Sequence, residues 1–149
     1  MITGVVDGLW AVVLTFAYQR SQIRLWQGIA ATAFGQGMFD RGAATVLLGL
    51  VMHFTVAFTW SAIFLWLVMR WSSLGRVLRT PLGAAKVAVV YGPMIWVVMS
   101  LIVIPLLTGN RTPITGRWAI QLAGHALFVG LPIVWSIRDN SATDRAVAA

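Results

Sequence analysis

The stretch that decides the fold runs from Ala43 to Met69 and reads AATVLLGLVMHFTVAFTWSAIFLWLVM, 27 residues without a formal charge. A helix rises 1.5 Å per residue, so this stretch is about 40 Å long and exceeds the hydrocarbon thickness of a bilayer. We therefore predict a transmembrane span whose ends protrude or whose axis tilts. Arg70 closes the stretch, and a basic loop extends from there to Lys86.

Three more apolar stretches flank this span. They run from Gly4 to Gln19, from Val87 to Leu107 and from Trp118 to Ile137. The segment between Arg24 and Asp40 has about 15 uncharged residues, fewer than the roughly 20 that a span needs. We predict a short re-entrant or interfacial helix there, with a fifth span as the alternative.

The composition supports this reading. Of the 149 residues 59% are hydrophobic and 10% are charged, whereas soluble domains are about 45–50% apolar and about 25% charged. A water-soluble fold of this length cannot bury so much apolar surface, which argues against a soluble enzyme, a nucleic-acid-binding domain and a disordered chain. The predicted fold is an all-α integral membrane protein, a bundle of four transmembrane helices plus the short helix. Residues 1–139 form the single domain, followed by a polar tail at 140–149.

The charge balance indicates partners and orientation. The formal net charge is +7, which in this context points to the lipid bilayer and its anionic head groups, with no nucleic acid as partner. In the four-span arrangement, six Lys and Arg residues share the side of both termini and five lie on the other side. The positive-inside rule then favours cytoplasmic termini. No cleavable signal peptide is expected, because Asp7 precedes every basic residue. Without cysteine, disulfides and thiolate metal sites are excluded.

Polar side chains within the spans are candidate functional residues, since they are costly in a membrane. Counting along each span places four of them at one depth in one leaflet, about 10–15 Å below the same face. Gln27 approaches from that face, and Trp60 shares a helical stripe with the histidine of its span. The candidate ligand-binding residues are therefore His53, Ser100, Gln121, His125, Trp60 and Gln27.

Asp7 is expected to lie apart from these candidate residues. We expect it near the opposite face, at the N-terminal end of the first helix, where the helix dipole favours a carboxylate. An intramembrane acid is the alternative.

The last span also shows a packing pattern. Ala119, Ala123, Ala126 and Gly130 follow spacings of 4, 3 and 4, which predicts a small-residue seam for close helix contact. The flank opposite Gln121 and His125 is expected to face lipid and consists of Ile120, Leu127, Leu131 and Val134. We expect Pro105 and Pro132 to mark kinks.

The two histidines allow three interpretations. They are structural hydrogen-bond donors, or they line a titratable cavity for a small molecule, ion or proton. In the third, they ligate a metal: haem between His53 and His125, or Cu(I) with Met52 and Met99 added. No metal-binding spacing is present, so no cofactor is predicted and haem or Cu(I) is the alternative.

Catalytic motifs are absent from the sequence. It has no Gly-x-Ser-x-Gly, P-loop or Gly-x-Gly-x-x-Gly pattern. Paired carboxylates are also unavailable. We therefore do not predict an enzyme, and only an unorthodox histidine site would support one.

Several short motifs resemble a known group of proteins. They are Gly-Leu-Val-Met-His-Phe (49–54), Ile-Pro-Leu-Leu (104–107), Gly-His-Ala-Leu-Phe-Val-Gly-Leu-Pro-Ile (124–133), residues 7–11 and Trp-Gln-Gly-Ile-Ala (26–30). With them the chain resembles small uncharacterised bacterial inner-membrane proteins and, distantly, the YagU-like family. The resemblance implies a bacterial inner membrane and a histidine in the last helix, and it brings no activity.

Three function classes follow. The first is a small polytopic membrane protein that handles a small molecule, ion or proton through the His/Gln/Ser layer. The second is a non-catalytic accessory or structural subunit of a membrane complex, and the third is a haem- or copper-binding membrane protein. Since four helices enclose little volume, we expect a transporter of this size to form a homo-oligomer or join a larger complex.

Overall fold

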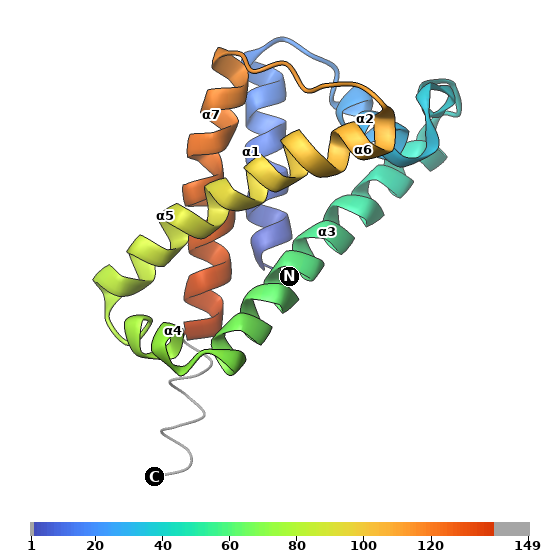
Figure 1. Cartoon of the computed structure of the whole chain (residues 1–149). Helices are drawn as coiled ribbons and strands as arrows, with labels where there is room; N and C mark the ends of the chain where they lie inside the picture. Colours follow the sequence, from blue (N-terminus) through green and yellow to red (C-terminus); the bar gives the residue numbers. More distant parts are fainter. Residues whose placement is uncertain (1, 139–149) are drawn as a thin grey trace.

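The computed structural model describes residues 2–138, which fold into helices without strands (Figure 1). Three helices are long and apolar enough to cross a membrane: Ala43–Arg70, Pro81–Thr108 and Gly116–Arg138. The all-helical prediction is thus confirmed. The first predicted span forms a shorter apolar helix, Ile2–Ala17. The predicted polar tail at 140–149 lies outside the described residues.

The spans predicted at 87–107 and 118–137 each contain a change of helix type. Both have a π-helical segment of five residues within them, named η2 and η3. After η3 the last helix continues to Arg138. The elements in chain order are α1 (Ile2–Ala17), α2 (Gln22–Phe34), the 3₁₀ helix η1 (Gln36–Asp40), α3 (Ala43–Arg70), α4 (Ser72–Val77), α5 (Pro81–Val98), η2 (Met99–Val103), α6 (Ile104–Thr108), α7 (Gly116–His125) and η3 (Ala126–Gly130).

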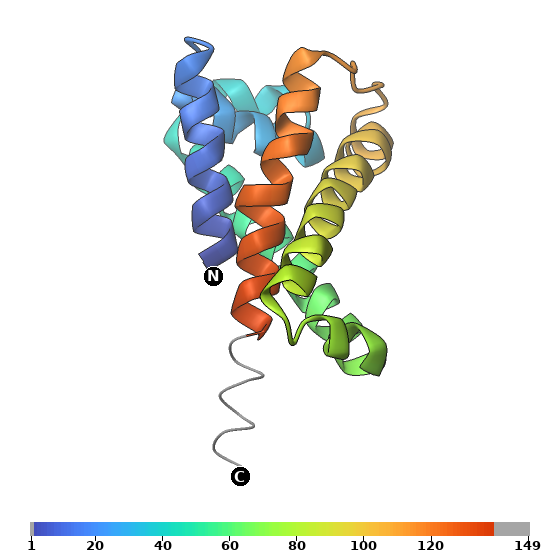
Figure 2. The same ribbon diagram turned by 90° about the vertical axis from the view of Figure 1, so that its left-hand side faces the viewer.

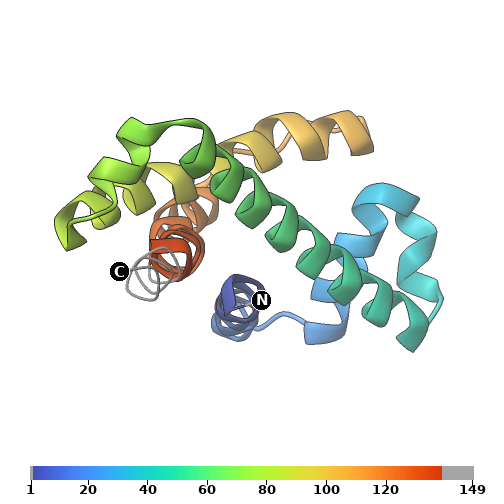
Figure 3. The same cartoon turned by 90° about the horizontal axis from the view of Figure 1, so that it is seen from below.

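The helices form two differently oriented sets. α1 and α7 lie side by side and run in opposite directions (Figures 1 and 2). α3 and α5 run obliquely to this pair, so from below α1 and α7 are seen nearly end-on while α3 is seen lengthwise (Figure 3). The start of α1, α4 and the end of the last helix lie at one end of the bundle, and the α1–α2 and α6–α7 connections lie at the other (Figure 1).

α2 is the ambiguous segment of the sequence. Its 13 residues measure about 20 Å, so it is too short to span a membrane. The Ser21 hydroxyl caps its start, and Gly35 ends it with a φ of 83°, a conformation that suits glycine. α2 packs closely on α3, because a side chain at Gly49 would collide with the Trp26 carbonyl. The segment thus forms the short helix that was predicted, and the structure adds that it packs against α3.

α5 and the last helix meet through glycines. A Cβ atom at Gly92 would collide with the His125 carbonyl oxygen, and one at Gly130 would collide with that of Ala88. This close approach matches the way small residues permit helix packing in membranes. Next to it lies a core that includes Phe64, Tyr91, Ile95, Ile133 and Val134.

Each π segment ends two residues before a proline. Pro105 follows η2 and Pro132 follows η3. A proline lacks the N–H for the carbonyl four residues earlier and collides with that carbonyl in an ordinary helix. Those carbonyls belong to Leu101 and Phe128, which lie inside the two π segments. The wider turn therefore accommodates the proline without ending the helix.

The π segment η3 also corrects the predicted faces of the last helix. Ala126 and Gly130 are buried as the seam requires, but Ala119 and Ala123 are exposed. Val134, expected to face lipid, is fully buried. The sequence estimate used about 100° per residue throughout, and the wider π turn changes that phase by roughly one residue. The predicted faces therefore fail at Ala119 and Ala123 before η3 and at Val134 after it, whereas Ala126 and Gly130 inside η3 are buried as expected.

Candidate functional site

A cavity of about 280 Å³ lies inside the bundle. α1, α2, α3, α5, α6, α7 and both π segments all contribute lining residues. Most of the lining is apolar, with Trp60 and Trp96 among the larger side chains. Within residues 2–138, the titratable side chains that line it are Asp7, His53 and His125. The cavity therefore combines an apolar wall with three titratable side chains, named here the Asp7–His53–His125 trio.

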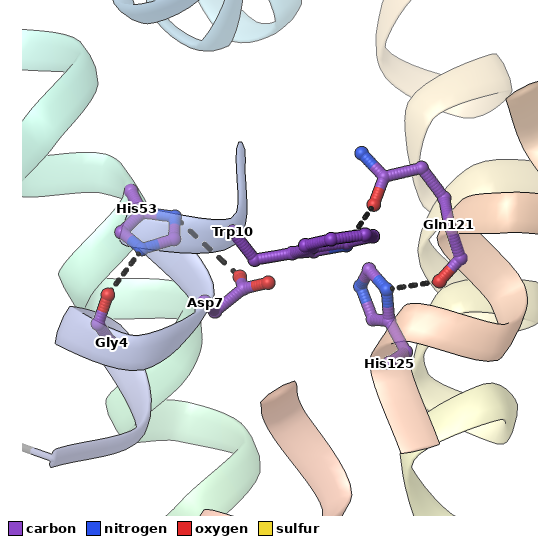
Figure 4. Close-up of polar contacts among 6 residues, drawn as sticks. All are labelled: Gly4, Asp7, Trp10, His53, Gln121 and His125. Atoms are coloured by element: carbon purple, nitrogen blue, oxygen red, sulfur yellow. Dashed lines mark hydrogen bonds and ion pairs between the residues drawn. The ribbon is translucent and has the colours of Figure 1, made fainter. Parts of the chain in front are cut away.

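His53 lies against the backbone of α1 (Figure 4). Its Nε2 atom is 2.8 Å from the Gly4 carbonyl oxygen. Because a carbonyl only accepts, Nε2 carries the proton and donates. The other ring nitrogen, Nδ1, lies 3.9 Å from Asp7 Oδ2. A Cβ atom at Gly8 would lie 3.4 Å from Nε2, an ordinary van der Waals distance, so His53 also packs against this turn of α1.

His125 is held in a similar way on the last helix. Its Nδ1 atom donates to the Gln121 carbonyl oxygen at 2.8 Å, so in the neutral ring Nε2 is the acceptor. Nε2 points to the side of Asp7 (Figure 4). His125 is 8% exposed and its ring lies 4.8 Å from that of Trp96, centre to centre. The helix widens into η3 directly after this residue.

Trp10 connects α1 to the last helix beside the trio. Its Nε1–H donates to Gln121 Oε1 at 3.1 Å, and its ring stacks on Phe128 with centres 4.4 Å apart. Gly124 leaves room for the indole, because a Cβ atom there would collide with Trp10 Nε1. The side chain and the backbone of Gln121 thus position Trp10 and His125, respectively (Figure 4).

Asp7 lies between the two histidines, and the expectation of a separate position at the opposite face is wrong. It is 23% exposed and interacts electrostatically with both rings. The depth estimate assumed a first span that crosses the whole bilayer. α1 has 16 residues, about 24 Å, so a position five residues from its start already lies well inside the bundle.

The other predicted residues are divided between different environments. Trp60 lines the cavity, and its carbonyl accepts from the Tyr91 hydroxyl at 2.8 Å. Ser100 is fully buried away from the cavity lining and accepts from Trp118 Nε1 at 3.0 Å. Gln27 donates to Thr45 and to the Gly42 carbonyl. The structure therefore brings His53, His125 and Trp60 together, while Ser100 and Gln27 connect neighbouring segments.

Sequence reasoning missed the contribution of the first helix. Thr3, Asp7 and Trp10 follow spacings of 4 and 3 and so share one face of a helix. Gly4 and Gly8 form the small-xxx-small pattern that allows close helix contact. These two signals together point to a polar face packed against a partner helix.

The possible metal donors are also defined. Met52 and Met99, the predicted soft donors for Cu(I), line the same cavity as the two histidines. Across residues 2–138, however, no three His, Cys, Asp or Glu side chains are grouped closely enough to hold a metal ion.

No family model, curated protein or solved structure matches this chain. The resemblance to YagU-like proteins therefore stays an expectation.

Proposed function

We propose that the protein is a multi-pass protein of the bacterial inner membrane with four transmembrane passes and both termini in the cytoplasm. Three long apolar helices support the membrane assignment. α1 would be the fourth pass, because it lies beside the last helix and runs opposite to it (Figure 1). Six Lys and Arg residues on the side of the termini, against five on the other, support the orientation.

The function supported best is binding of a small, largely apolar molecule in the central cavity. The observation that carries this proposal is the convergence of almost every helix on one apolar cavity that also contains the trio. Apolar pockets with a few convergent polar groups are the usual form of small-molecule sites. If the histidines were purely structural, their hydrogen bonds to the two carbonyls would be sufficient. No cavity beside them would then be required.

Titration calorimetry with a small uncharged aromatic probe, 2-phenylethanol, tests this proposal on protein in detergent micelles. Val56 lines the cavity, and Val56→Trp fills it. Val51, on the same helix, is 55% exposed, so Val51→Trp is the matched control. We expect Val56→Trp to weaken binding at least about tenfold, the effect of losing about 1.4 kcal/mol of contact, and Val51→Trp to leave it unchanged. Equal affinities in both variants would contradict the proposal.

A further inference from the structure

We propose that the ligand carries a positive charge, and that the cavity takes a small apolar amine in its ammonium form, bound at Asp7 in exchange for a proton. This inference rests on the proposed function and specifies the chemical class of the ligand. It follows from the charge of the lining, from the hydrogen bonds of the two histidines and from the nature of the wall.

The formal charge of the cavity lining is negative. Among the described lining residues Asp7 is the only acid, and no Lys or Arg accompanies it. From the elements packed around it, Asp7 is faced by His53 on α3 and His125 on α7, whereas the residues of α2, α5, α6 and the π segments that line the cavity do not titrate. A carboxylate inside a bundle needs a cationic partner. The histidines or a bound cation must supply it.

The histidines present acceptors to that carboxylate. His53 commits Nε2–H to the Gly4 carbonyl, and His125 commits Nδ1–H to the Gln121 carbonyl. In the neutral rings the remaining nitrogens, Nδ1 of His53 and Nε2 of His125, are acceptors, and both lie toward Asp7 (Figure 4). Asp7 Oδ2 and His53 Nδ1 then face each other at 3.9 Å as two acceptors and require a donor. An ammonium group has three N–H donors and a positive charge, which matches this set.

The wall suits the rest of such a ligand. Trp60 and Trp96 line the cavity together with Met52 and Met99. Aromatic faces attract cations, and thioethers adapt to irregular apolar groups. The lining therefore favours an amine on a compact hydrocarbon body over a hydrated metal ion.

The exchange balances as follows. Without ligand, the Asp7 carboxyl would hold one proton, because no Lys or Arg among the described lining residues offsets its charge. When the ammonium binds, its N–H groups donate to Asp7 and to the acceptor nitrogens, and that proton leaves to solvent. One cation enters and one proton departs, so the charge of the site is unchanged.

Calorimetry with matched probes tests the inference. The probes are 2-phenylethylamine, which is an ammonium ion near neutral pH, the uncharged 2-phenylethanol and the anion 3-phenylpropanoate. Titrations between about pH 5 and 8, the range in which histidine titrates, in buffers of different ionisation enthalpy count the protons released. We expect the amine to bind at least about tenfold more tightly than the alcohol, with proton release, while the anion does not bind.

Asp7→Asn is the decisive variant, and Asp40→Asn, at an exposed acid on η1, is its control. Asp7→Asn should lose the preference for the amine and the proton release but retain binding of the alcohol, which shows that it is folded. If Asp7→Asn fails to fold, Asp7→Glu should retain both properties. Equal affinity of wild-type protein for amine and alcohol, or amine binding without proton release, would overturn the inference and leave the cavity function intact. Failure of wild-type protein to bind any probe would instead overturn the proposed function.

Discussion

His53 Nδ1 faces Asp7 Oδ2 at 3.9 Å across the contact between α3 and α1. The two residues are 46 positions apart in the sequence. Their side chains are 10% and 23% exposed, so bulk water screens the pair poorly. We expect this pair to contribute to stability as a unit.

A double-mutant cycle measures that coupling. Asp7→Asn and His53→Ala should show an interaction energy of about 0.5–3 kcal/mol in the free energy of unfolding in micelles, the range for residues in contact. The control cycle pairs His53→Ala with Asp40→Asn. His53 lies about 15 Å along α3 from its start, so the control should be additive. Additivity in both cycles would show that Asp7 and His53 act independently.

The glycine contact between α5 and the last helix predicts a position-specific cost. Gly92→Ala places a methyl group against the His125 carbonyl, and overpacking of this kind costs about 1–3 kcal/mol. Gly75 on α4 has no atom within 4 Å of an added Cβ, so Gly75→Ala should be neutral or stabilising by up to about 1 kcal/mol. Thermal unfolding of both variants gives the comparison. If Gly92→Ala unfolds at the same temperature as wild-type protein, α5 and the last helix can move apart for an added methyl group without loss of stability, which would contradict the prediction.

Ser100 is expected to be a structural polar residue that takes no part in ligand binding. Ser100→Ala removes the acceptor of the Trp118 N–H, and interhelical hydrogen bonds in membranes are worth about 0.6 kcal/mol on average. We expect a small loss of stability and unchanged affinity for 2-phenylethanol. Loss of probe binding at unchanged stability would return Ser100 to the ligand site.

Anionic lipid should associate with the end of the bundle opposite the termini. Arg20, Arg24 and Arg117 line neighbouring hollows there with Tyr18, and the guanidinium of Arg117 lies 4.1 Å from the centre of the tyrosine ring. Each basic residue near an anionic surface contributes about 1 kcal/mol. Native mass spectrometry with phosphatidylglycerol should show less bound lipid after Arg20→Gln/Arg24→Gln. The control Arg76→Gln/Arg79→Gln removes the same charge at the other end, and an equal loss there would argue against a localised site.

The spans were predictable because exposure to lipid is a local property of the sequence. The 27 uncharged residues from Ala43 to Met69 required a long helix wherever the rest of the chain lay. A short helix between Arg24 and Asp40 was expected from the same counting, and the structure forms one at Gln22–Phe34. In both cases the evidence lies within a few turns of one helix.

The site was only partly predictable because it depends on how helices meet. His53 and His125 were found as polar residues in apolar spans, and they do line one cavity. Asp7 was misplaced because its height depends on where the short α1 lies beside α3. Ser100 was grouped with the histidines by depth, but depth does not determine the direction of a side chain. The π segments altered that direction in the last helix.

The difference in length between α1 and α3 has a consequence for the surrounding lipid. α1 has 16 residues and α3 has 28, about 24 Å and 42 Å as helices. In a bilayer with a core of about 30 Å, α3 is long enough to tilt, whereas α1, if it is the fourth pass proposed above, is shorter than the core and requires thinner lipid beside it. Stability would then depend on acyl-chain length. Because Asp7 lies on α1, such a fourth pass would couple bilayer thickness to the position of the carboxylate, and the affinity of the cavity for its probes would vary with acyl-chain length.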